Sequence, residues 1–118
     1  TQRLVSLCKQ NLVEAHDTEE ISRLAAHHDI DLNGEREAVF DMVPQVIERA
    51  KDVERDRQID FDDMIWLPIV LDLPLFVSDL LLVDEAQDLN RCQQALALKA
   101  GKRLILCGDP KQAIYGFA

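Results

Sequence analysis

The sequence predicts an α/β protein in which a helical segment, residues 1–58, precedes a short parallel sheet within residues 59–118. Two short, mainly apolar runs predict the sheet: "LLLV" at residues 80–83 and "RLILC" at residues 103–107. Each run is bounded by polar residues, which is typical of a strand covered on both faces. Residues 89–101 between them favour a helix. Strand, helix and strand in this order form the unit of a parallel sheet, with a right-handed crossover.

The first 58 residues predict charged, amphipathic helices. Apolar residues recur at helical spacing over residues 2–14, which indicates a first helix. Asp17, followed three residues later by Glu20, is typical of a helix N-terminus, because the side-chain oxygen can accept from a free backbone N–H. We expect this second helix to end near His27.

A third, long helix is expected over residues 35–57, where the apolar residues keep the helical period. Pro44 falls inside this range. Because proline lacks a backbone N–H and its ring clashes with the preceding turn, the helix should kink or split there. Asp60 followed by Asp63 is a second helix-start pattern, and it predicts a short apolar helix that stops before Pro74.

Composition limits what the chain can do alone. Its 118 residues suffice for one modest domain, and 47% of them are hydrophobic. A formal net charge of −9 argues against a complete DNA-binding surface, since such surfaces need Lys and Arg to neutralise phosphates. Three widely spaced cysteines without a CxxC pair predict a reduced, cytoplasmic protein. We expect neither a signal peptide nor a membrane partner, since the sequence shows no apolar run of membrane-spanning length.

Polar residues follow both predicted strands at the point where each strand ends. Asp84 and Glu85 come directly after the first strand, and Asp109 and Gln112 follow the second. Ligands of open parallel sheets bind beyond the carboxyl ends of the strands, and two acids there can hold a hard cation, position a water, or both. The structural alternatives are a charged strand end for the first pair and turn formation by Asp-Pro for the second.

Four sequence elements resemble those of superfamily 1 DNA helicases of the UvrD/Rep/PcrA group. "VDEAQD" at residues 83–88 and "GDPKQAIYGFA" at residues 108–118 resemble motifs II and III of that group. "DFDDM" at residues 60–64 and "DLNRCQ" at residues 88–93 are similar to neighbouring elements, in the correct order. The resemblance implies a partial RecA-like P-loop NTPase domain over residues 59–118. The helices before it would belong in part to an inserted 1B subdomain.

The resemblance also implies a role for individual residues. Asp84 would hold the Mg²⁺ that bridges the β- and γ-phosphates of ATP, and Glu85 would orient or deprotonate the attacking water. Gln112 would sense the γ-phosphate. Tyr115 and Phe117 lie in the segment expected to meet single-stranded DNA, where aromatic rings stack on bases. The parent protein would then couple ATP hydrolysis to movement on DNA.

The sequence also departs from the family pattern. It contains no GxxxxGKS or GxxxxGKT, so the loop that cradles phosphates is missing, and Ala118 stands where the group usually has Arg. Gln87 and Asp88 complete motif II and are expected to link nucleotide state to neighbouring loops. We expect the chain to be a piece of a longer protein and inactive by itself.

The partners expected from this reading are single- and double-stranded DNA through the intact parent, and the missing parts of the same polypeptide. A second copy is also expected, because the strand near residues 103–107 should present an open apolar edge. The alternative reading is a non-catalytic, P-loop-derived module used for binding or scaffolding.

Overall fold

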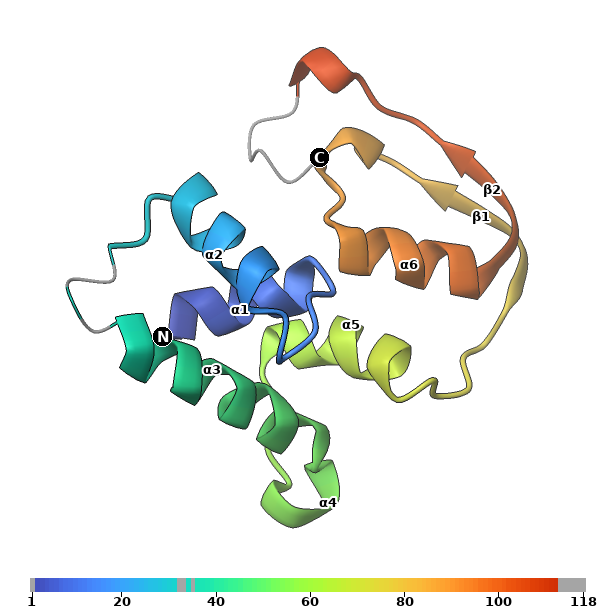
Figure 1. Ribbon diagram of the computed structural model, residues 1–118. Helices are drawn as coiled ribbons and strands as arrows, with labels where there is room; N and C mark the ends of the chain where they lie inside the picture. The colour runs from blue at the N-terminus through green and yellow to red at the C-terminus, as the bar shows by residue number, and fades with distance from the viewer. Residues whose placement is uncertain (1, 32–33, 35, 113–118) are drawn as a thin grey trace. The chain divides into compact units, whose positions relative to one another are not determined.

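Helices occupy the first part of the chain, and a strand–helix–strand unit lies in the second (Figure 1). The computed structural model describes residues 2–31, 34 and 36–112. The chain divides into two compact units, Thr1–Met64 and Ile65–Ala118. The mixed α/β architecture with parallel strands confirms the predicted fold class. The domain boundary between residues 58 and 59 stays a prediction.

The first unit is built around α1 (Gln2–Gln10), which packs against α2 (Thr18–His27) and α3 (Arg36–Lys51). All three helices contribute apolar side chains to the core, together with one residue of the α1–α2 turn. The buried apolar residues are Leu4, Val5, Leu7, Cys8, Ala15, Ile21, Ala25, Val43 and Ile47.

The first helix is shorter than predicted, and its C-terminal cap explains why. Leu12 has a φ of +54°, the left-handed conformation that closes helices. Its N–H donates to the Lys9 carbonyl at 3.3 Å, and the N–H of Val13 donates to the Cys8 carbonyl at 2.9 Å. These bonds end α1 at Gln10, so the predicted extension to residue 14 is wrong. The second helix does begin as predicted, since Asp17 accepts from the Glu20 N–H at 3.1 Å.

The long third helix is continuous through Pro44, so the alternative that it splits there is wrong. Proline removes one hydrogen bond, but Val43 and Ile47 are both buried and hold the helix on either side of it. The break comes instead at Asp52, whose side chain accepts from the Arg55 N–H at 3.3 Å and starts the short α4 (Val53–Asp56).

Helix α5 (Phe61–Val70) begins with a reciprocal pair of capping bonds. The N–H of Asp63 donates to Asp60 Oδ1 at 2.8 Å, and the N–H of Asp60 donates to Asp63 Oδ2 at 3.0 Å. This confirms the helix start predicted from the spacing of the two acids. Trp66, in the same helix, is buried.

In the second unit, β1 (Ser78–Val83) pairs in parallel with β2 (Gly101–Leu106). The register sets Ser78 opposite Gly101 and Val83 opposite Leu106. Between the strands run the 3₁₀ turn η1 (Ala86–Asp88) and helix α6 (Arg91–Ala100), and a second 3₁₀ turn, η2 (Pro110–Gln112), follows β2. The predicted strand–helix–strand unit is therefore confirmed.

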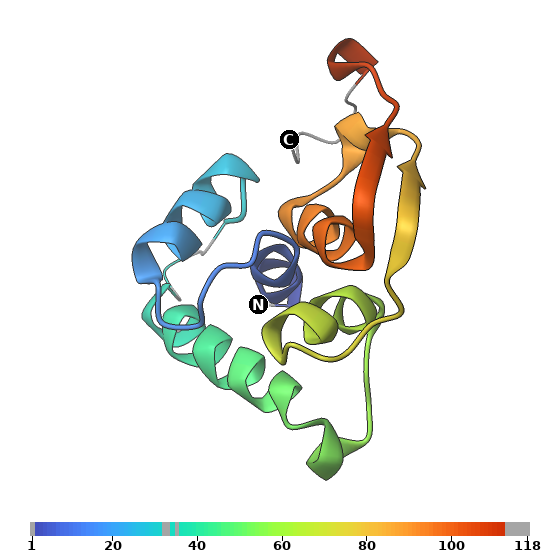
Figure 2. The ribbon, with the colours of Figure 1, turned by 90° about the vertical axis from the view of Figure 1, so that its right-hand side faces the viewer.

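The expectation that both faces of the strands are covered is wrong for the part of the chain that the structure describes. Helix α6 contacts both strands and lies along one face of the sheet (Figure 2). Leu80, Leu82 and Ile105 alternate with the residues of that face and are 45%, 68% and 48% exposed. Among the described residues, α6 covers one face of the two-stranded sheet, and the side chains on the other face stay exposed.

No helix within residues 2–31 and 36–112 is both long and apolar enough to cross a membrane. None of the three cysteines forms a disulfide within the described residues: Cys8 and Cys92 are buried, and Cys107 is exposed.

Candidate functional site

The two parallel strands bring the predicted polar residues to one edge of the sheet. Backbone bonds continue beyond the strand ends: the N–H of Cys107 donates to the Val83 carbonyl at 2.8 Å, and the N–H of Ala86 donates to the Cys107 carbonyl at 2.9 Å. The segment with Asp84 and Glu85 therefore lies beside the turn at residues 107–109. This is the carboxyl edge of the sheet, where ligands of such folds bind.

Asp84 and Glu85 are both exposed at this edge. The Glu85 N–H donates to Asp84 Oδ1 at 2.8 Å, which orients the Asp84 carboxylate. Glu85 has a φ of +53°, a left-handed conformation that costs a non-glycine residue about 1–2 kcal/mol. The other described non-glycine residues with positive φ follow helix ends: Leu12, Asp29, Arg57 and Asp72. Glu85 instead lies between a strand and a 3₁₀ turn.

Gln87 connects this carboxylate to the neighbouring turn. Its Nε2 donates to Glu85 Oε2 at 2.5 Å, and its Oε1 accepts from the N–H of Asp109 at 3.1 Å. Gly108 lies so close that a Cβ there would come within 2.3 Å of Gln87 Oε1. The family resemblance gave Gln87 a general linking role, but its two partners follow only from the structure.

Asp88 supplies a third carboxylate near the strand ends. Its N–H donates to the Glu85 carbonyl at 3.0 Å, which places it one turn beyond Glu85. Its Oδ1 is buried and has no hydrogen-bond partner within the described residues. Burying an unpaired carboxylate oxygen is costly, so this oxygen suits a donor or cation supplied by a ligand.

The donor set fits magnesium bound together with a nucleotide. No three His, Cys, Asp or Glu side chains gather into a metal site within residues 2–31, 34 and 36–112. Mg²⁺ does not need such a cluster, because it usually takes one or two carboxylates and fills its octahedron with water and substrate phosphates. The exposed carboxylate of Asp84 can serve as such a ligand.

The remaining predicted site residues follow β2. The Lys111 N–H donates to Asp109 Oδ1 at 2.9 Å, so the Asp-Pro sequence does form a turn. Gln112 ends η2 close behind this turn, although its side chain is outside the described part of the chain. Tyr115 and Phe117 also lie outside the described residues. The roles assigned to these three residues stay predictions.

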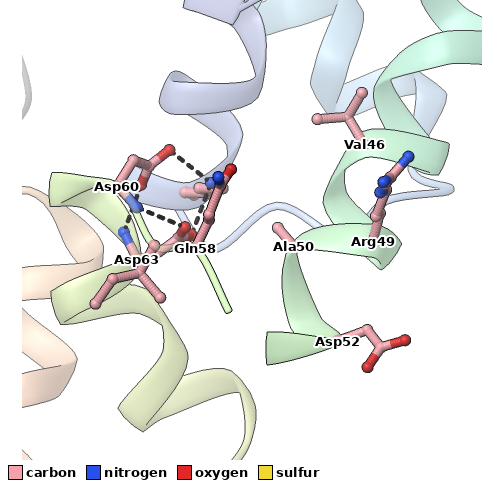
Figure 3. Close-up of a pocket in the computed structure, with 9 residues that line it drawn as sticks. Val46, Arg49, Ala50, Asp52, Gln58, Asp60 and Asp63 are labelled. Carbon is pink, nitrogen blue, oxygen red and sulfur yellow. Dashed lines mark hydrogen bonds and ion pairs between the residues drawn. The ribbon is translucent and has the colours of Figure 1, made fainter. Parts of the chain in front are cut away.

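A second cluster of charges lies in the first unit, beside a pocket of about 350 Å³ (Figure 3). Asp60 and Asp63 line one side of this pocket, and Val46 and Arg49 of α3 line the other. Lys9 Nζ lies 2.7 Å from Asp63 Oδ1 and 3.1 Å from Asp60 Oδ2. The sequence gave no signal for this cluster, because Lys9 is far in sequence from both of its partners.

The charges of this cluster compensate one another. Burial alone would lower the pKa of Lys9, but hydrogen bonds and charges from Asp63 and Asp60 outweigh it and raise the pKa above 10.5. Burial would raise the pKa of Asp60, yet the Asp63 backbone N–H and Lys9 outweigh it and lower the pKa below 3.8. Asp62 accepts hydrogen bonds from Ser6 and Gln10 on the same helix as Lys9. The cluster therefore connects α1 to the start of α5 through ion pairs and hydrogen bonds. Because its charges are already paired, we assign it a structural role and take the strand edge as the candidate functional site.

The family comparison covers the whole chain. Residues 1–118 match the family model described as the UvrD/REP helicase N-terminal domain. The match confirms the family suggested by the motifs and extends it over residues 1–58, where no motif was placed. No curated protein and no solved structure matches the chain.

Proposed function

The chain belongs to the UvrD/REP helicase family, and on that premise we propose that it is part of an ATP-dependent DNA helicase or translocase. The whole protein would couple ATP hydrolysis to movement along single-stranded DNA. The observation that carries the proposal is the meeting of Asp84, Glu85 and the turn at residues 107–109 at the carboxyl edge of a parallel sheet. Nucleotides bind at this edge in open α/β folds.

Within this proposal the two adjacent acids have different tasks. Asp84, whose carboxylate is oriented by the Glu85 N–H, would hold Mg²⁺. When bound, the ion neutralises developing negative charge on the phosphates. Glu85 orients the attacking water and accepts its proton, a task that needs a carboxylate near the γ-phosphate.

The segment after β2 would connect the nucleotide to DNA. Gln112 would contact the γ-phosphate, and Tyr115 and Phe117 would meet single-stranded DNA. In the longer protein, Gln112→Ala should keep ATP affinity but lose stimulation of the ATPase by DNA. Phe117→Ala should weaken single-strand binding by about 1–3 kcal/mol if a base stacks there. Full stimulation in Gln112→Ala would contradict the coupling role.

The 118-residue chain by itself should not hydrolyse ATP, because its sequence contains neither the phosphate-binding loop nor that loop's lysine. The alternative function is a non-catalytic binding or scaffolding module derived from the same fold. The test compares ATPase rates of the longer protein with and without Glu85→Gln. Loss of a general base should lower kcat by about 10²–10⁴-fold. An unchanged kcat, or turnover by the isolated chain, would contradict the assignment.

Three kinds of partner follow from the proposal. DNA would bind through the longer protein, since the chain itself carries a net charge of −9. Other parts of the same polypeptide, or a second copy, would cover the open edge and exposed face of the sheet. Light scattering of the isolated chain at high concentration tests self-association, and a monomer would count against it. We also propose a cytoplasmic location, since none of the three cysteines forms a disulfide within the described residues.

A further inference from the structure

Gln87 contacts both of the segments that follow the two strands, Glu85 after β1 and Asp109 after β2. Its amide nitrogen donates to Glu85 Oε2 at 2.5 Å, and its amide oxygen accepts from the Asp109 N–H at 3.1 Å. One side chain thus uses its donor on the carboxylate after β1 and its acceptor on the turn after β2. An amide can do this, whereas an ionised carboxylate has no donor and lysine has no acceptor.

The backbone around Gln87 is held on both sides. Glu85 sits in a left-handed conformation, and its carbonyl accepts from the Asp88 N–H at 3.0 Å. Opposite, an added Cβ at Gly108 would lie 2.3 Å from Gln87 Oε1 and 3.0 Å from the backbone nitrogens of Ala86 and Gln87. The Gln87 amide therefore occupies space that exists because position 108 has no side chain.

We propose that Gln87 is a positioning residue that fixes the Glu85 carboxylate relative to the turn at residues 107–109. This inference rests on the proposed function, because it assigns Glu85 to the attacking water. Gln87 acts through Glu85 and touches neither nucleotide nor metal. Since the turn runs directly into η2, a displacement of the segment after β2 moves the carboxylate that handles the water.

Two substitutions separate the two contacts. Gln87→Ala removes both, whereas Gln87→Glu keeps an acceptor for the Asp109 N–H and removes the donor to Glu85. Amide hydrogen exchange in the 118-residue chain reports on the turn. Exchange at Asp109 should be about 2–10-fold faster in Gln87→Ala, the equivalent of one lost hydrogen bond, and unchanged in Gln87→Glu.

ATPase kinetics of the longer protein report on the carboxylate. Both variants should lower kcat by about 10–100-fold, as small misplacements of a reacting group do. The KM for ATP should stay within about twofold, because Gln87 makes no contact with the nucleotide in this proposal. Gln94→Ala is the matched control: Gln94 lies in the same unit and donates to the Leu89 carbonyl at 3.1 Å, away from Glu85. It should keep the wild-type kcat and the wild-type exchange at Asp109.

The outcomes distinguish this inference from the proposed function. If Gln87→Glu keeps a wild-type kcat while Glu85→Gln abolishes turnover, Gln87 merely anchors the turn and the inference is overturned. If Glu85→Gln itself keeps its activity, the proposed function fails first, and the inference fails with it. A low kcat in Gln87→Glu with a protected Asp109 amide supports the positioning role.

Discussion

Lys9→Met should be among the most destabilising single substitutions in the first unit. The Lys9 and Asp63 side chains are 4% and 6% exposed and lie 2.7 Å apart, so they form a buried ion pair. Removing one partner leaves an uncompensated buried charge and costs about 3–5 kcal/mol. The second contact, to Asp60, adds about 0–1 kcal/mol because the Asp60 side chain is 59% exposed.

A loss of about 3–5 kcal/mol is a large fraction of the free energy of unfolding. A chain of 118 residues has a free energy of unfolding of roughly 6–18 kcal/mol. With a urea dependence of about 2 kcal/mol per M, losing 3–5 kcal/mol lowers the urea midpoint by about 1.5–2.5 M. Urea unfolding of the isolated chain, followed by circular dichroism, measures this shift directly.

Lys51→Met is the matched control. Lys51 lies 3.0 Å from Glu48 on the same helix, but the two side chains are 34% and 52% exposed. Such a pair contributes about 0.3–0.5 kcal/mol, so the midpoint should fall by only about 0.2 M. Equal shifts for the two variants would refute the reasoning from burial.

A double variant tests the mechanism of the loss. Lys9→Met with Asp63→Asn removes the uncompensated charge, while the amide oxygen at position 63 can still accept from the Asp60 N–H. The double variant should recover more than half of the decrease in urea midpoint seen in Lys9→Met, because the loss of stability comes from the unpaired buried carboxylate and not from the missing lysine. A double variant no more stable than Lys9→Met would show that lost packing of the lysine stem dominates.

Three further predictions concern other features. Gly108→Ala should lower kcat of the longer protein about as much as loss of the positioning amide, because the new Cβ would displace it; an unchanged kcat would contradict this. Cys107, which is exposed, should react with a thiol reagent in the folded chain, whereas Cys8, whose pKa burial raises to about 11, should react only on unfolding, as mass spectrometry can show. The lowered pKa of Asp60 and the raised pKa of Lys9 should make the unfolding free energy fall below pH 3.8 and again above pH 10.5. Chemical denaturation at several pH values checks this, and a flat profile would speak against both shifts.

Features that depend on a few neighbouring residues could be predicted from the sequence. Asp17 and Asp60 both cap helices as predicted, and in each case the partner lies three residues further along the chain. The ion pairs of Lys9 could not be predicted in the same way, since its partners come from a different helix. The end of α1 was also missed, because a left-handed leucine at position 12 has no sequence signal comparable to glycine.

The strand edge was predicted for a different reason. Once two apolar runs form parallel strands, the residues after each run must meet at one edge, so Asp84, Glu85 and Asp109 could be placed together without any contact being known. The bridging role of Gln87 needed the structure, because it depends on the left-handed turn at Glu85 and on the space above Gly108. Topology thus fixes which segments meet, while side-chain geometry decides which atoms bond.

The two strands are apolar in sequence, but one face of their sheet is exposed in the structure. An apolar run predicts a strand that is buried on both faces, and Leu80, Leu82 and Ile105 provide the apolar side chains of the face opposite α6. The structure shows that α6 supplies cover on one face, while these three side chains remain about half exposed or more. Contiguous exposed apolar residues mark interaction surfaces in folded proteins. The open face is therefore where the proposed partners, further parts of the helicase or a second copy, would gain the burial that the sequence pattern requires.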